Sequence, residues 1–128
     1  MLGENKTIGF VASVDLKRAR AFYEGVLGLR FLKDDGFAAV FSAGDRMVRI
    51  ANVAQVPDFK PLPFTVLGWE VENVNATAAA LRERGVTFER YSWMEQNEHG
   101  VWASPTGDSV AWFKDPDGNI LSLTAFRR

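Results

Sequence analysis

The chain has 128 residues, of which 47% are hydrophobic and 24% charged, and it carries a net charge of −1 with a pI near 5.8. This composition is that of an ordinary globular domain that can bury a core, and the small net charge argues against nucleic acid or an anionic membrane as a partner. The absence of cysteine excludes disulfides, thiolate catalysis and sulfur-ligated metals.

The N-terminal residues lack the apolar run of a signal peptide, and no stretch of the sequence approaches membrane-spanning length. We therefore expect a cytoplasmic protein without a membrane segment.

The first half of the chain predicts a strand, a helix and three more strands. Residues 8–14 are rich in apolar side chains, and Asp15 follows where its carboxylate can cap a helix. Apolar side chains recur at helical spacing over residues 16–27, and Gly28 is placed to end that helix in a left-handed conformation. Further strands are expected at residues 29–33, 37–42 and 47–53.

The second half predicts a similar order of elements, a strand and a helix followed by further strands. A connector at residues 54–63 holds three of the five prolines and separates the halves. After it we expect a strand at 64–71, a helix at 74–84, strands at 86–91 and around 101–103, and a hairpin of strands 109–114 and 120–126. The turn of this hairpin is Asp115-Pro116-Asp117-Gly118-Asn119, in which proline presets one backbone angle and glycine permits a positive φ.

The two halves are a self-repeat. Asn73 lies fifty-eight positions after Asp15 and opens a helix in the same way, and the two helices lead into Gly28-Leu29-Arg30-Phe31 and Gly85-Val86-Thr87-Phe88. Such a repeat indicates a duplicated architecture. We predict one domain over residues 1–128, with module one at about 7–56, module two at about 63–126, and a cavity shared between them.

Two segments resemble the signatures of a known superfamily. Val14-Asp15-Leu16, with Ala21-Phe22-Tyr23 and Val26-Leu27-Gly28-Leu29, is similar to the opening of the vicinal oxygen chelate superfamily, and the stretch from Phe113 to Leu121 is similar to its closing signature. Glyoxalase I, extradiol dioxygenases, fosfomycin-resistance transferases and bleomycin-resistance proteins belong to it. The resemblance implies an α+β fold of two βαβββ modules, whose curved mixed sheets enclose a cavity, and a homodimer.

The resemblance also implies four positions at which metal-dependent members hold a divalent ion. Carried over to this chain, they are Ile8, Val66, Ser122 and Arg49, or Val48 if the turn lengths differ by one. Isoleucine and valine offer no lone pair, a serine hydroxyl is a weak neutral ligand, and an arginine cation repels a metal ion. We therefore predict no metal and no cofactor. An alternative cluster of Glu95, Glu98 and His99 could ligate an ion, or it could be a plain solvated loop.

Strand alternation sends Phe10, Arg49, Glu70 and Ser122 toward the predicted cavity. Arg49 could clamp an anionic or carbonyl-bearing ligand where the metal would have polarised oxygen; alternatively, it pairs with Glu70 or points into solvent.

Tryptophan supplies the remaining candidates for ligand contact. Trp69 is expected in the core, whereas Trp93 and Trp102 flank the polar stretch 94–100, where their rings could stack on a planar ligand. Of Trp112 and Phe113, one faces the cavity and the other the opposite side of the sheet. For Trp93, Trp102 and Trp112, packing in the core or a dimer interface is the alternative. The stretch 94–100 is either a flap hinged at Gly100 or a surface loop.

Three functions remain open from the sequence. The first is a metal-free homodimer that sequesters a small, flat or partly anionic organic molecule, as the resemblance to bleomycin-resistance proteins implies. The second is a lyase, isomerase or dioxygenase-like enzyme of the same fold, with Glu70 as a base and Arg49 stabilising an oxyanion. The third is a structural or regulatory dimer with a filled cavity.

Overall fold

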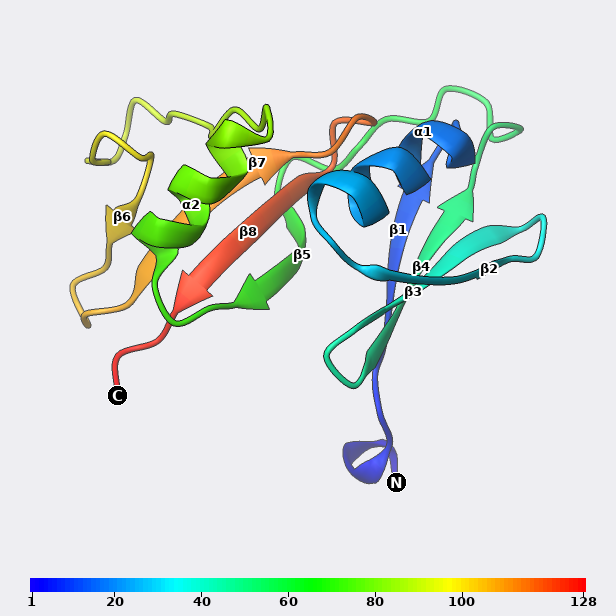
Figure 1. Cartoon of the computed structure of the whole chain (residues 1–128), viewed down its shortest axis with the longest axis horizontal. Helices are drawn as coiled ribbons and strands as arrows, with labels where there is room; N and C mark the ends of the chain where they lie inside the picture. The colour runs from blue at the N-terminus through cyan, green and yellow to red at the C-terminus, as the bar shows by residue number, and fades with distance from the viewer. The chain divides into compact units, whose positions relative to one another are not determined.

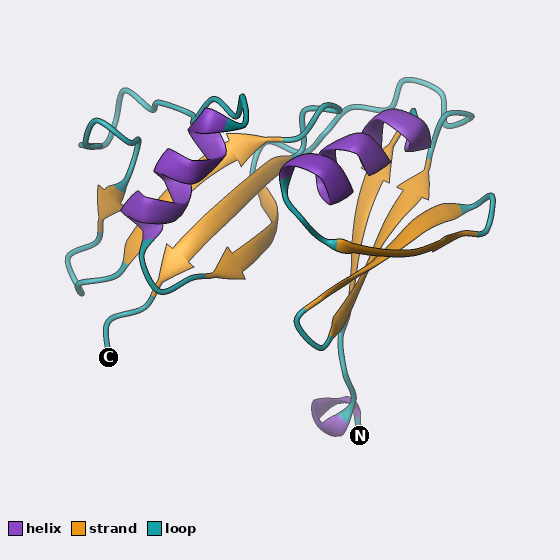
Figure 2. Ribbon diagram, in the orientation of Figure 1, coloured by secondary structure: helices purple, strands orange, loops and turns teal.

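The computed structural model describes all residues, 1–128, and divides into two compact units, Met1–Pro61 and Leu62–Arg128. Each unit contains one four-stranded sheet with a helical segment against one face (Figure 1). Helices are few and strands dominate, as the ribbon shows (Figure 2). The predicted α+β fold of two βαβββ modules is confirmed.

The first unit begins with a short 3-10 helix, η1 (Leu2–Glu4), ahead of the module. The module consists of β1 (Ile8–Ser13), α1 (Leu16–Arg20), η2 (Ala21–Val26), β2 (Arg30–Asp34), β3 (Ala38–Ala43) and β4 (Arg46–Asn52). Its strands lie in the order β1-β4-β3-β2, and only the β1–β4 pair is parallel.

The second unit repeats this topology. It consists of β5 (Thr65–Glu70), α2 (Val74–Glu83), β6 (Trp102–Ala103), β7 (Ser109–Lys114) and β8 (Ile120–Ala125). The strand order is β5-β8-β7-β6, and β5 and β8 form the parallel pair.

Both helices begin at the residues that the sequence predicts. The Asp15 carboxylate accepts a hydrogen bond from the N–H of Arg18 at 3.1 Å, and the Asn73 side chain accepts one from the N–H of Ala76 at 3.0 Å. Each bond satisfies an otherwise unpaired first-turn donor. Gly28 ends the first helical segment with φ 79°, which a residue with a Cβ rarely adopts.

The second half of the first helical segment is π-helical. The N–H of Leu27 donates to the carbonyl of Phe22, five residues earlier, at 2.9 Å. The wider turn still buries Tyr23 completely, and its ring lies 6.1 Å from that of Phe41 in β3. The spacing of apolar side chains in the sequence predicts a helix here, but it does not distinguish a π-helix from an α-helix.

Each helical segment packs on one face of its sheet, and alternation leaves the other face for other contacts. In the second unit, Phe113 is fully buried on the helix side, stacked on Trp69 with ring centroids 6.4 Å apart and next to Phe88 at 5.4 Å. Trp69 therefore packs on the helix side of the sheet, as predicted, where it is half-buried. We call the face of each sheet opposite its helix the open face.

The strand predicted at residues 86–91 is wrong. Only an isolated bridge between Phe88 and Phe113 and one hydrogen bond, from the N–H of Glu89 to the carbonyl of Trp112, connect this segment to β7. The backbone N–H of Tyr91 bonds instead to the side chain of Gln96. The pairing of this segment with β7 therefore ends after Phe88 and Glu89.

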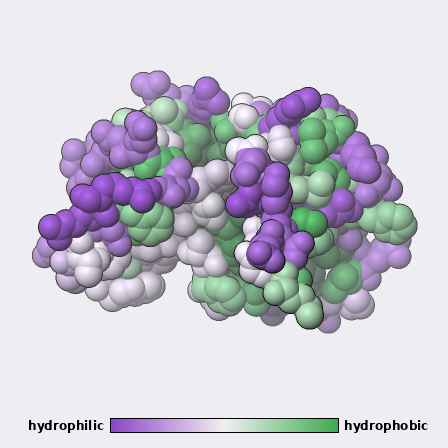
Figure 3. Space-filling model, turned by 90° about the horizontal axis from the view of Figure 1, so that it is seen from below, coloured by the Kyte–Doolittle hydropathy of each residue, from purple (hydrophilic) through white to green (hydrophobic).

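Apolar side chains are also exposed on the surface, where they alternate with polar ones (Figure 3). Phe10 is 62% exposed and Ile8 is 49% exposed, although both are in β1. No helix in the structure has the length and apolar composition that crossing a membrane requires.

Candidate functional site

On the open face of the first sheet, Arg49 lies in register opposite Phe10. The register pairs Phe10 in β1 with Arg49 in β4, whereas Val48 and Ile50 are buried on the helix side. Arg49 therefore lies on the open face of β4, as alternation predicts, and Val48 lies on the opposite face.

The guanidinium of Arg49 pairs with a carboxylate that the sequence did not suggest. Its Nη2 donates to Oδ2 of Asp35, in the turn between β2 and β3, at 3.0 Å. Oδ1 of Asp35 accepts the backbone N–H groups of Phe37 and Ala38, both at 2.9 Å. The Arg49 hydrogen bond, followed by these two backbone bonds, lowers the pKa of Asp35 from its ordinary value of 3.8. Within the second unit, Glu70 pairs with Arg128.

On the open face of the second sheet, Ser122 lies between Gly68 and Trp112. β8 pairs Ser122 with Gly68 of β5 on one side and with Trp112 of β7 on the other. A Cβ on residue 68 would lie 2.5 Å from the Ser122 hydroxyl oxygen. Glycine at position 68 thus leaves free the space on the face of the sheet that the Ser122 side chain occupies.

The four metal-ligand positions do not carry a competent set of donors. Ile8 and Val66 have hydrocarbon side chains, Arg49 is a cation, and only Ser122 offers an oxygen. A metal ion does not fit this set. The alternative cluster is also not assembled: His99 Nε2 lies 3.7 Å from Glu98 Oε1, but no third carboxylate or histidine joins them.

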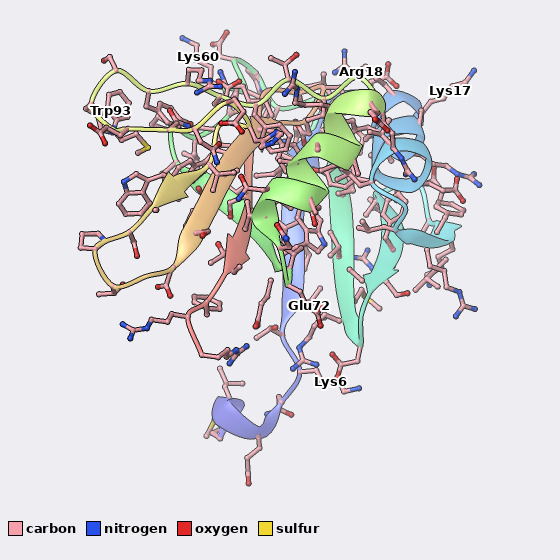
Figure 4. The ribbon with its side chains drawn as sticks, turned by 60° about the vertical axis from the view of Figure 1, so that its left-hand side comes forward. Lys6, Lys17, Arg18, Lys60, Glu72 and Trp93 are labelled. Carbon is pink, nitrogen blue, oxygen red and sulfur yellow. The ribbon has the colours of Figure 1, made fainter.

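Trp93, Trp102 and Trp112 lie in one row of aromatic rings, together with Tyr91. Ring centroids are 4.8 Å apart for Trp93 and Tyr91, 5.7 Å for Tyr91 and Trp112, and 6.3 Å for Trp112 and Trp102. Because Phe113 points to the core, its neighbour Trp112 faces the open side, which decides between the two residues. Trp93 lies on the loop between α2 and β6 (Figure 4), and 75% of it is exposed.

Tyr91 is the site residue that the sequence reasoning missed. Tyr91 lies only two positions before Trp93, and this close spacing of two aromatic residues is the signal that could have found it. Partial burial, and after it the charge of Glu89, raise the pKa of the Tyr91 hydroxyl above its ordinary value of 10.0.

The loop of residues 94–100 is held by side chains that bond to backbone groups. The Gln96 amide accepts the N–H of Tyr91 at 2.8 Å and donates to the carbonyls of Glu89 and Gly100, both at 2.9 Å. The Arg90 guanidinium donates to the carbonyls of Gln96, Asn97 and Glu98. Gly100 has φ 82°, and a Cβ there would lie 3.1 Å from Cβ of Phe88. The loop is therefore an ordered wall, which does not support a flap hinged at Gly100.

This loop, the edge strand β6 and the first turn of α2 surround a pocket of about 760 Å³, which we call the tryptophan pocket. Trp93, Met94 and Trp102 supply its large apolar surfaces, and Asn75, Glu95, Gln96, Asn97 and Ser109 its polar groups. The volume is in the range of small-molecule sites. Asn97 Nδ2 donates to Asn75 Oδ1 at 2.7 Å and so joins the loop to α2.

We expect Arg49→Met to raise the pKa of Asp35, because the largest cause of its depression is removed. A depressed carboxylate pKa stabilises the folded state above the ordinary value of 3.8, and this contribution is lost as the pH falls through the folded-state pKa. The stability difference between the wild type and Arg49→Met should therefore be largest near neutral pH and shrink in acid. NMR titration of the Asp35 carboxyl and urea unfolding at several pH values measure both effects. An unchanged Asp35 titration in the variant would contradict the ion pair.

We expect Gln96→Glu to destabilise the protein by about 1–3 kcal/mol, because a carboxylate would replace the amide donor that faces two carbonyl oxygens. Gln55→Glu makes the same chemical change at an exposed position of the connector and serves as the control. Urea unfolding followed by tryptophan fluorescence measures the difference. Equal stability of the two variants would show that Gln96 does not hold the loop.

Comparisons with known proteins agree with this architecture. The family model of the Glyoxalase/Bleomycin resistance protein/Dioxygenase superfamily matches residues 8–123. Comparison with curated proteins gives no match.

Several solved structures share the fold at low sequence identity. A superfamily member from Sphaerobacter thermophilus DSM 20745 is 22% identical with a TM-score of 0.77, covering 98% of this chain and 100% of its own. A glyoxalase family protein from Bacillus anthracis is 18% identical with a TM-score of 0.73, covering 97% and 96%. Lactoylglutathione lyase from Agrobacterium tumefaciens is 18% identical with a TM-score of 0.71, covering 95% and 93%. The family model spans most of the chain, so this protein belongs to the Glyoxalase/Bleomycin resistance protein/Dioxygenase superfamily.

Proposed function

We propose that the protein binds a small, flat organic molecule in the tryptophan pocket and acts by sequestering it, without a metal ion. The observation that carries this proposal is the pair of tryptophans, Trp93 and Trp102, on the wall of one pocket of about 760 Å³. Aromatic rings offer large contact surfaces at a small cost in conformational entropy. Tyr91 and Trp112 lie between them in the same row of ring contacts.

The metal-free part of the proposal rests on the donor set. Metal-assisted reactions need a carbonyl or water polarised by an ion held by several oxygen or nitrogen ligands. Ile8, Val66 and Arg49 supply no such ligand, and Ser122 alone cannot replace them.

The enzymatic alternative is less well supported by the contacts of its two proposed groups. Glu70 is ion-paired with Arg128, and Arg49 with Asp35, so neither is poised as an unpaired base or oxyanion-stabilising group. The structural alternative, a dimer whose interior is filled, gives no role to the pocket with two tryptophans on its wall.

We expect planar aromatic compounds to quench tryptophan fluorescence and to raise the melting temperature progressively as the ligand concentration increases. Trp102→Leu should weaken binding by about two- to tenfold through the loss of ring stacking. Trp69→Phe, which changes a tryptophan on the helix side of the sheet and outside the pocket, is the control and should retain the affinity of the wild type. Binding should survive chelator treatment, and metal analysis should find no stoichiometric zinc, nickel, iron or manganese. A loss of binding on chelation would contradict the metal-free proposal.

The proposal includes a homodimer, supported by the exposed Phe10 and Ile8 on the open face of β1. Apolar side chains gathered on a strand face are typical of surfaces that associate. We expect Phe10→Asp to shift the protein from dimer to monomer in light scattering coupled to size exclusion. Phe37→Asp, at an even more exposed phenylalanine outside the strands, should leave the mass unchanged. A monomeric wild type would contradict the proposal.

A further inference from the structure

The charges around the tryptophan pocket are unlike those expected for an anionic ligand. Of its ten lining residues, only Glu95 is charged. Glu95 is exposed, and none of the ion pairs in the structure involves it. The pocket therefore presents a carboxylate and no cation.

The two amide groups of the loop that line the pocket already donate to protein acceptors. Both N–H groups of the Gln96 amide donate to backbone carbonyls, and Asn97 Nδ2 donates to Asn75. An anion entering the pocket would lose part of its hydration and find no cation in the lining to compensate, which makes its binding costly.

Nearby positive charges are directed elsewhere. The Arg90 guanidinium is bonded to three carbonyls of the loop, and Lys114 Nζ lies 3.4 Å from Glu89 Oε1. The second unit as a whole has nine Asp and Glu residues and six Lys and Arg residues, which gives it a net charge of −3. The first unit has seven Asp and Glu residues and nine Lys and Arg residues, and its net charge is positive. The electrostatic field in this unit therefore favours positive charge.

The aromatic row adds a second attraction for cations. The faces of Trp and Tyr rings are electronegative, and a cation over a tryptophan face is the strongest case of this interaction. Trp93 and Trp102 border the same pocket as the Glu95 carboxylate. Met94, also in the lining, contributes a polarisable thioether.

We propose that the ligand of the tryptophan pocket is an organic cation, with an aromatic or quaternary ammonium group that lies against Trp93 and Trp102 and is neutralised by Glu95. This inference rests on the proposed function, because it names the chemical class of ligand for the same pocket.

The test compares three probes of similar shape and different charge at slightly alkaline pH: 1-methylquinolinium, neutral 2-methylquinoline and quinoline-2-carboxylate. Affinities are measured by isothermal titration calorimetry. The cation should bind about three- to thirtyfold more tightly than the neutral probe, and the carboxylate should bind most weakly. Added salt should weaken binding of the cation and leave the neutral probe unaffected.

Glu95→Gln and Glu98→Gln separate a local effect from the general charge of the unit. Both side chains lie on the same loop, but Glu98 does not line the tryptophan pocket. Glu95→Gln should lower the affinity for 1-methylquinolinium toward that for 2-methylquinoline, whereas Glu98→Gln should retain the cation preference. Equal unfolding curves of the two variants establish that the fold is unchanged.

The outcomes distinguish this inference from the proposed function. If all three probes bind equally, or if Glu95→Gln weakens them all alike, the cation preference is overturned while binding of flat molecules stands. Tighter binding of quinoline-2-carboxylate also overturns it. If none of the probes binds, the proposed function fails as well.

Discussion

The position of Phe113 on the helix side of the second sheet determines most of what surrounds the candidate site. Phe113 is fully buried between Trp69 and Phe88, whose rings lie 6.4 Å and 5.4 Å from its own. Because side chains alternate along a strand, burying Phe113 forces Trp112 onto the open face beside Ser122. A slip of one residue in the register of β7 would exchange the two aromatic side chains and remove the support of the aromatic row.

The sheet that carries this row is incomplete at one edge, and side chains replace the missing ladder. β6 has only two residues, and the segment before it pairs with β7 at a single bridge. Gln96 and Arg90 together form six hydrogen bonds to the backbone of residues 89–100, so the polar groups of the irregular chain are satisfied. The loop is thereby fixed without belonging to the sheet. Trp93 and Glu95 are exposed side chains of this segment, and the core does not depend on them.

The sequence predicts the architecture well because its signals are local. Three kinds of local signal each depend on a few neighbouring residues: the helix caps at Asp15 and Asn73, the left-handed conformation of Gly28, and the alternation in β4 and β7. Each of these predictions agrees with the structure. The failures involve contacts between distant residues. The ion pair joins Arg49 to Asp35, which lies in a turn fourteen positions earlier in the chain. A sequence shows that both residues are charged, but it does not show how far apart they lie in space. The strand predicted at residues 86–91 fails because the bonding of Gln96 to the chain at Tyr91 has no periodic signature.

The anchoring of this loop has a consequence for how the protein can diversify. Ser92, Trp93, Met94 and Glu95 lie between two fixed points, the backbone of Tyr91 and the side chain of Gln96, and all four are exposed or half-buried. Substitutions within this tetrapeptide can alter the chemistry presented to a ligand while the anchors and the interior remain as they are. New ligand preferences can therefore arise here by a few mutations with little penalty in folding, and a library randomised at these four positions is a rational starting point for engineering selectivity.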